Sequence, residues 1–210
     1  MPTGTGKVTI DMAAPASQDL SAVSVETLIG EAMRRIFTHV NMRDASLVDT
    51  PKRVAKFWKE FNTVTDVDQL LGRSFDNSQG SSGMVVQTDV PVRCLCEHHL
   101  APFFGVAHIG YFPNRRVVGL SKLARLVDAV GTRRPSVQET LTEELASLLY
   151  HGLESRGCIV VVRAEHTCMT VRGVNKPGVL TTTSSVKGLF RDAAQVREEF
   201  FRIINLGDRS

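Results

Sequence analysis

A long run of β-branched residues in the second half of the chain is the feature that most limits its possible folds. The run lies in the stretch GCIVVVRAEHTCMTV, residues 157–171. Such a composition is typical of strands, and three other stretches share it: MVVQTDVPVRC, FFGVAHIGYF and RVVGL. The sequence therefore predicts a β-sheet built from residues between 84 and 171.

Helical periods occupy the segments outside these strands. Apolar side chains recur at helical spacing over residues 23–40, 121–130, 137–149 and 189–203. A further helix is expected after Thr50, which can cap it, with Pro51 in the first turn, where its missing N–H is not needed. Strands and helices are segregated along the chain, which predicts an α+β fold with a mainly antiparallel sheet backed by helices.

The expected domain organisation is simple. Residues 1–18 are rich in small and polar residues and predict a flexible N-terminal tail. We expect residues 19–210 to form a single domain, with an N-terminal helical part over about 19–75 and a core over about 84–206.

The composition argues against several kinds of protein. The net charge over 210 residues is +3, and the basic residues are dispersed among acidic ones. We therefore expect no nucleic-acid partner. The chain also begins without a secretory signal and contains no apolar segment of membrane-spanning length, so we expect no membrane partner.

The chain has four cysteines. In a chain without an export signal, such cysteines indicate thiols or metal ligands rather than a disulfide framework. The expected location is the cytoplasm.

Soft ligands and acid/base groups gather in the stretch RCLCEHHLAPFFG. Cys96 and His99 are three residues apart, and this spacing lets thiolate and imidazole turn toward one ion, with zinc the preferred metal. Downstream, His166 and Cys168 are two apart in an expected strand, so their side chains point to the same face. The pattern predicts three or four metal ligands: four would close the site, and three would leave a position for water.

Two qualifications follow from the residue types. Adjacent His98 and His99 cannot easily aim at the same ion, so one of them is available for acid/base work. Small buried cysteines are also common in strands, and this structural interpretation is the expected one for Cys94 and Cys158.

Five separated motifs resemble the GTP cyclohydrolase I family in the same order. They are CEHHLAPFFGVAHIGYFP, GLSKLARLVD, RRPSVQETLT, EHTCMTVRGV and TTTSSVKGLF. The resemblance spans about residues 49–204 and includes the chemical residues described above.

The resemblance implies a T-fold (tunnelling fold) protein that assembles into a homo-oligomeric ring, commonly a decamer, with active sites between subunits. It also implies an enzyme that converts GTP and water to 7,8-dihydroneopterin triphosphate and formate, the first step of pterin and folate biosynthesis. Neither the sequence nor the resemblance identifies a regulatory protein partner.

The same resemblance implies roles for the clustered residues. It makes Cys96, His99 and Cys168 the ligands of one zinc ion per subunit, with water in the fourth position. It makes His98 and His166 the acid/base pair, with His166 the first candidate for protonating a guanine ring nitrogen as the ring is hydrated.

Glu139 has two interpretations. Ser136 and Glu139 have the spacing of a capping box, which predicts a helix cap. The resemblance instead makes Glu139 the guanine anchor, because a carboxylate can accept the ring N–H and the exocyclic amine together. Gln138 is a further candidate for the base pocket.

The resemblance assigns the triphosphate to a set of cations and one hydroxyl. Arginine suits bidentate phosphate contacts, whereas lysine acts as a point charge. The expected contacts are Ser121, Lys122, Arg125, Arg172 and Arg53.

Departures from the family pattern occur at Cys94 and Thr140. A thiol at Cys94 raises the prospect of an oxidisable pair with Cys96, which would eject the metal. Two other interpretations belong to different classes. A T-fold nitrile reductase of the queuosine pathway uses a cysteine nucleophile and a nicotinamide cofactor, and lacks this zinc set. The second interpretation is a non-catalytic paralogue that serves as a metal-dependent scaffold or regulatory subunit. The presence of His98, His166 and Glu139 together argues against it.

Overall fold

The computed structural model describes residues 21–41, 43–78 and 80–206. The expected tail, residues 1–18, lies outside the described residues. The chain divides into two compact units, of which the first ends at Phe57 and the second begins at Trp58. The domain bounds expected from the sequence remain a prediction.

The first unit is helical. Helix α1 spans Val25–Ile36, and the Ser24 side chain caps it by accepting a 3.1 Å hydrogen bond from the Thr27 N–H. The helix ends four residues before the expected limit at Val40. Helix α2, Thr50–Lys59, begins in this unit and carries its proline in the first turn, as predicted.

The second unit is built on an antiparallel sheet with the strand order β2-β3-β5-β6. These strands span Val85–Leu95, Pro102–Phe112, Gly157–His166 and Leu180–Gly188. A small second sheet pairs β1, Ser74–Asp76, with β4, Arg116–Val118, and follows the short helix α3, Val67–Gly72.

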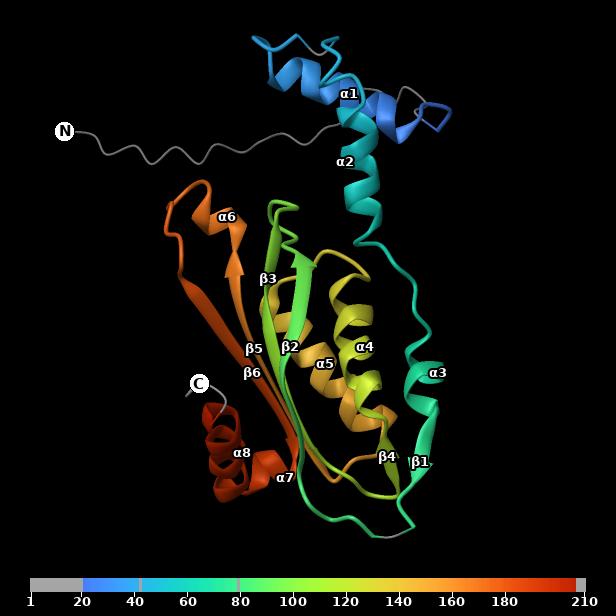
Figure 1. Ribbon diagram of the computed structural model, residues 1–210, viewed down its shortest axis with the longest axis vertical. Coiled ribbons are helices and arrows are strands. Elements are labelled where there is room, and N and C mark those ends of the chain that lie inside the picture. Colours follow the sequence, from blue (N-terminus) through green and yellow to red (C-terminus); the bar gives the residue numbers. More distant parts are fainter. Residues whose placement is uncertain (1–20, 42, 79, 207–210) are drawn as a thin grey trace, which may run out of the picture. The chain divides into compact units, whose positions relative to one another are not determined.

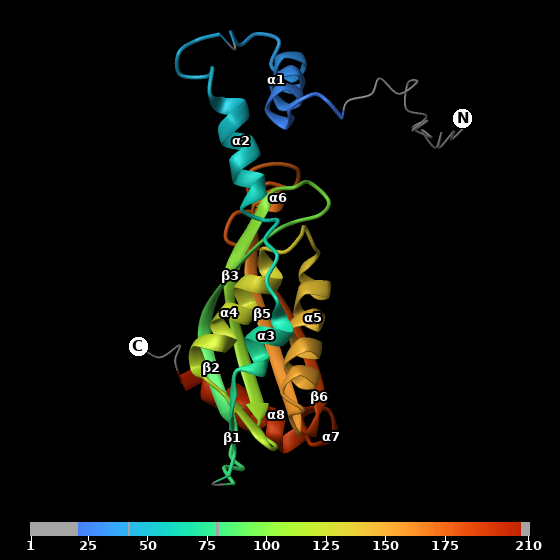
Figure 2. The same cartoon turned by 90° about the vertical axis from the view of Figure 1, so that its right-hand side faces the viewer.

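Helices cover both faces of the larger sheet (Figures 1 and 2). One face packs against α4, Leu120–Gly131, and α5, Gln138–Gly152; part of the other packs against α7, Leu189–Asp192, and α8, Ala194–Leu206. Strand β5 lies between these two layers. Its Val160 and Val162 belong to one core and its Ile159 and Val161 to the other, which explains the unbroken β-branched run.

Three features differ from the sequence-based expectation. The strand predicted over residues 157–171 ends at His166 and continues as the helical turn α6, Thr167–Thr170. The last helix is divided at Ala193, which has an extended backbone. Strand β6 was not predicted, because its threonine- and serine-rich sequence resembles a loop by composition.

No helix among the described residues combines the length and apolar character that a membrane span requires.

Candidate active site

Cys96 lies immediately after β2, where the backbone is held on two sides. Its N–H donates to the Ala101 carbonyl at 2.9 Å, and the residue forms an isolated parallel bridge with Ser136. The turn from Cys96 to Ala101 returns the chain to β3 and includes Leu100 at φ 51°. A positive φ is uncommon for leucine, so the fold enforces a compact turn at this position.

His166 and Cys168 reach the same region from the end of β5. The expectation that both lie in one strand is wrong, because Cys168 belongs to α6. The helical turn nevertheless brings the two side chains together. The ligand atoms of Cys96, His166 and Cys168 all lie within 4.8 Å of one another.

This donor set fits a metal ion of the zinc type. Thiolate sulfur and imidazole nitrogen are preferred zinc ligands at about 2.0–2.3 Å, so three donors this close together can converge on one ion with small adjustments. His99 lines the same cavity, but its ring nitrogens are not part of the three-atom group. The ligand set expected from the sequence, with His99 in place of His166, therefore remains a prediction.

Burial sets the protonation of the grouped side chains. Desolvation raises the pKa of the Cys168 thiol, and the neighbouring Cys96 adds to this increase, whereas Arg172 opposes it. Desolvation also lowers the pKa of His166 below 6.5, while the Glu139 carboxylate opposes that shift. Both shifts favour neutral side chains in the protein alone, and a bound cation would favour the thiolates.

The adjacent histidines diverge, as expected. The rings of His98 and His99 are 6.4 Å apart between centroids and inclined at 73°. Nδ1 of His98 lies 3.8 Å from the Cys96 sulfur. Both side chains are exposed and line the cavity, so His98 is placed beside the potential metal ligands and remains open to solvent.

The grouped donors form one wall of a cavity of about 430 Å³. Glu139 also lines it, with an exposed side chain. The capping-box interpretation of Glu139 is wrong: Val137 is the N-cap residue of α5, and the Ser136 hydroxyl instead donates to the Val137 carbonyl at 3.2 Å. The Glu139 carboxylate therefore has no capping role.

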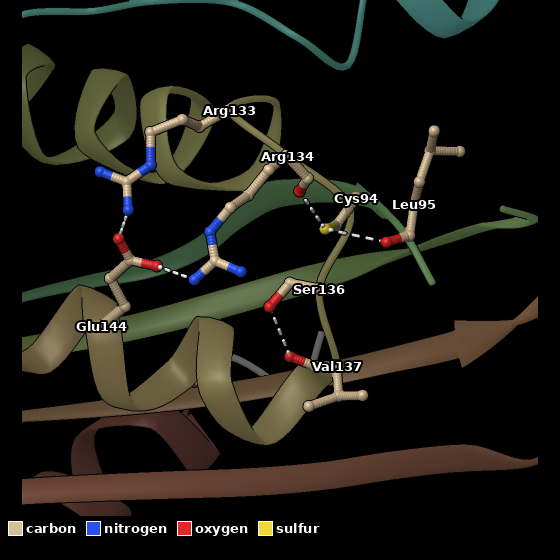
Figure 3. Close-up of polar contacts among 7 residues, drawn as sticks. All are labelled: Cys94, Leu95, Arg133, Arg134, Ser136, Val137 and Glu144. Atoms are coloured by element: carbon tan, nitrogen blue, oxygen red, sulfur yellow. Dashed lines mark hydrogen bonds and ion pairs between the residues drawn. The ribbon is translucent and has the colours of Figure 1, made fainter. Parts of the chain in front are cut away.

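The loop before α5 is tied down from both sides (Figure 3). Glu144 forms ion pairs with Arg133 and Arg134. On the opposite side, the sulfur of the buried Cys94 thiol lies 3.4 Å from the Leu95 carbonyl oxygen and 3.7 Å from the Arg134 carbonyl oxygen, which share its one hydrogen. These contacts connect the loop to β2, which Cys96 directly follows, and to α5, which carries Glu139.

Gln138 lines the cavity by position but is 1% exposed. Its side-chain nitrogen contacts three oxygens of the protein, and its side-chain oxygen contacts His166 at 2.8 Å. Both ends of the amide are therefore used within the chain. This arrangement does not favour the expected contact with the base.

The expected triphosphate contacts fall in separate places. Arg172 lines the cavity. Ser121, Lys122 and Arg125 lie in the first turns of α4, whereas Gly131 at its other end packs so closely on β2 that a Cβ would come within 2.4 Å of the Arg93 carbonyl. Arg53 belongs to the first unit and pairs with Asp49 at 3.7 Å.

The distance along α4 separates these groups from the cavity. At about 1.5 Å per residue, Ser121 is roughly 15 Å from Gly131 along the helix axis. The start of α4 lies at the far end of the sheet, where the Val118 N–H donates to the Tyr111 hydroxyl at 3.3 Å. Figure 1 shows β4 and the start of α4 at the end of the sheet opposite α6.

The structure adds cavity-lining residues that the sequence-based expectation lacked. They are Val137, Met169, Gly173, Val174 and Thr181. Four of them lie within six residues of an expected site residue. Thr181 was missed because its strand was missed.

Comparison with known proteins gave consistent matches. The sequence model for the GTP cyclohydrolase I family matches residues 29–205. A GTP cyclohydrolase 1 from Hydrogenobaculum sp. is 47% identical over 74% of this chain and 84% of its own length. A GTP cyclohydrolase 1 from Aquifex aeolicus is 47% identical over 75% of this chain and 84% of its own length.

A GTP cyclohydrolase 1 from Mycolicibacterium gilvum is 48% identical over 75% of this chain and 79% of its own length. A solved structure of an archaeosine synthase QueF-Like in the apo form aligns with a TM-score of 0.41 and 16% identity, over 51% of this chain and 96% of that one.

Proposed function

Because the chain belongs to the GTP cyclohydrolase I family, we propose that the cavity beside Cys96 is the site of that family's reaction. The reaction converts GTP and water to 7,8-dihydroneopterin triphosphate and formate, the first step of pterin and folate biosynthesis. The antiparallel sheet backed by α4 and α5 is the T-fold expected for the family.

The observation that carries the site assignment is the convergence of thiol and imidazole donors in the cavity that also contains Glu139. We propose zinc as the metal, held by Cys96, His99 and Cys168, with His166 a competing third ligand. When bound, zinc supplies Lewis acidity that lowers the pKa of water from 15.7 to about 7.

We assign proton transfer to His166 and His98. The lowered pKa of His166 favours a neutral imidazole, which can take a proton from the attacking water and pass it to the guanine ring nitrogen. His98, exposed at the cavity and 3.8 Å from the Cys96 sulfur, is placed to serve the later proton transfers of formate release and ring closure.

Glu139 is proposed to hold the base. A carboxylate at the start of a helix, free of any capping contact, can accept two hydrogen bonds from the guanine edge. Arg172, on the same cavity, is proposed to contact the triphosphate. The phosphate contact expected of Arg53 remains a prediction.

We further propose that Ser121, Lys122 and Arg125 serve the cavity of a second copy of the chain. Their position at the far end of α4 supports this, because roughly 15 Å of helix lies between Ser121 and Gly131, the end of α4 that packs on Arg93 of β2. A homo-oligomeric ring, commonly a decamer in the family, supplies such a neighbour. A cytoplasmic location remains a prediction.

The experiment that tests the function is formate release from GTP by the purified protein, with product fluorescence measured after oxidation. We expect both signals, their loss when the metal is stripped and their recovery with zinc. Binding of GTP by the zinc-loaded protein with neither signal would instead indicate a scaffold or a repurposed enzyme. NADPH-dependent turnover of a nitrile would favour the reductase alternative.

A further inference from the structure

The hydrogen bonds around Gln138 determine the orientation of its side-chain amide. Nε2 lies 3.0 Å from the Val162 carbonyl oxygen, 3.0 Å from the Thr181 carbonyl oxygen and 3.1 Å from the Thr183 hydroxyl. Carbonyl oxygens only accept hydrogen bonds. The amide nitrogen must therefore occupy this end of the side chain, because an oxygen there would face two further acceptors.

The neighbouring hydroxyls support the same orientation. The single hydroxyl hydrogen of Thr142 is donated to the Gln138 backbone carbonyl at 2.7 Å. The 2.6 Å contact between the Thr142 and Thr183 hydroxyls must then be donated by Thr183. Thr183 is left with lone pairs toward Gln138, so all three oxygens are acceptors and share the two hydrogens of the amide nitrogen.

The opposite end of the amide is consequently an oxygen, and it faces His166. Oε1 of Gln138 lies 2.8 Å from Nε2 of His166. Because an amide oxygen only accepts, Nε2 must carry the hydrogen of this bond. Phe103 stacks on the imidazole, with 4.4 Å between ring centroids and 17° between planes, and restrains the ring orientation.

We propose that Gln138 is a positioning residue that fixes His166 as the Nε2–H tautomer, so that Nδ1 is the ring nitrogen available to the reaction or to a cation. Neutral imidazole has one nitrogen with a lone pair, and the bond to Gln138 determines which one. The assignment replaces the expected contact of Gln138 with guanine. Its kinetic consequence rests on the proposed function, whereas the tautomer does not.

The direct test is solid-state nitrogen NMR on the full chain with labelled histidine, at a pH where the imidazoles are neutral. The method does not depend on oligomer size, and His166→Gln identifies the His166 signals among the 6 histidines. We expect the Nε2–H tautomer in the wild-type protein with and without zinc. Observation of the Nδ1–H tautomer would overturn the proposal, and this measurement needs no variant at position 138.

Gln138→Met separates positioning from substrate binding. Methionine has a similar length but provides neither amide group, so we expect the Nδ1–H form of His166 to become populated. We also expect kcat to fall about 10- to 100-fold, the usual effect of losing such a supporting contact, with the KM for GTP within about twofold of wild type. A large rise in KM with an unchanged tautomer would instead identify Gln138 as a base contact.

Thr183→Val is the matched control. It removes one of the three acceptors of the amide nitrogen but leaves both carbonyls and the bond from Gln138 to His166. We expect it to retain the Nε2–H tautomer. Loss of this tautomer in Thr183→Val would contradict the argument that the carbonyls of Val162 and Thr181 fix the orientation of the Gln138 amide. If wild-type protein releases no formate, the proposed enzyme function fails while the NMR result still decides the tautomer.

Discussion

Ser136 pairs with Cys96 as an isolated parallel bridge, in which the Ser136 N–H donates to the Leu95 carbonyl at 2.9 Å and its carbonyl accepts from the Glu97 N–H at 3.3 Å. This bridge ties the start of α5 to the end of β2. The residue proposed to hold the base and one potential metal ligand are therefore positioned by a single backbone frame.

The first prediction concerns Glu139. Replacing Glu139 by Gln removes the charge of the proposed base contact while preserving its shape, and hydrogen bonds to charged groups contribute about 1.5–3 kcal/mol. We expect the KM for GTP to rise roughly 10- to 100-fold in steady-state kinetics. Glu154→Gln, beyond the end of α5, is the control and should behave as wild type. An unchanged KM in Glu139→Gln would remove the assignment.

The second prediction separates the two candidate ligand sets. We expect Cys96→Ser, Cys168→Ser and His99→Ala to lose most of the bound zinc, and His166→Ala to retain it. Elemental analysis after gel filtration measures the zinc content per chain. The opposite behaviour of the two histidine variants would make His166 the third ligand, in agreement with its proximity to both sulfurs.

The third prediction concerns Cys94. Desolvation raises the pKa of its thiol to about 11, so less than about one part in a thousand is thiolate at neutral pH. We expect iodoacetamide to modify the half-buried Cys168 of the metal-free protein well before Cys94, as measured by peptide mass spectrometry. Prompt labelling of Cys94, or a disulfide with Cys96, would revive the redox hypothesis.

Sequence and structure agree best where a physical signal is local. The β-branched run of β5 and the leucine stripe of α5 predicted their elements, because burial on one or both faces determines those residue types. β6 was missed because its polar composition resembles that of a loop. In the structure the Thr183 hydroxyl forms hydrogen bonds with α5, and composition does not reveal such internal contacts. Ser136 was a plausible cap by spacing, but its backbone bridges Cys96, and Val137 is the N-cap residue of α5.

The site was predictable in its residue types but only partly in its geometry. The spacings of Cys96 with His99 and of His166 with Cys168 indicated a metal. The helical turn α6, which follows His166, brings His166 and Cys168 together in the three-donor group, and the sequence did not predict this turn. Burial of Gln138 also depends on contacts with β5 and β6, which are distant in sequence, so no local pattern could have indicated it.

The fourth prediction concerns stability and pH. Hydrogen bonds from Lys187 and Ser185 hold the pKa of Glu143 below 4.5, and these contacts join α5 to β6. A lowered folded-state pKa stabilises the protein above the unfolded value, and this contribution is lost as the pH falls through the folded value. We expect Glu143→Gln to cost less than about 1 kcal/mol near pH 6, because the carboxylate is 57% exposed.

Urea unfolding from pH 6 to 3 measures this difference. The wild type and Glu143→Gln should converge in free energy of unfolding as the pH falls below about 4.5. A difference that persists at pH 3 would mean that packing, rather than charge, accounts for the effect.

The fifth prediction tests the shared site. Arg125→Ala and Glu139→Ala proteins should each have low activity when purified alone. Co-expression should restore part of the wild-type formate release, because some sites in a mixed ring combine an intact α4 start with an intact cavity. No recovery in rings shown by mass spectrometry to contain both chains would contradict the sharing of sites between subunits.

If the sites are shared between subunits as proposed, the separation between the start of α4 and the cavity also has a genetic consequence. A chain that contributes to two sites transmits a defect in each: an altered α4 disables the neighbour's cavity, and an altered cavity leaves the neighbour's cations without a substrate. A chain carrying both defects would therefore silence two sites at once. Such an allele would be dominant over the normal copy, with activity falling more steeply than the fraction of altered chains.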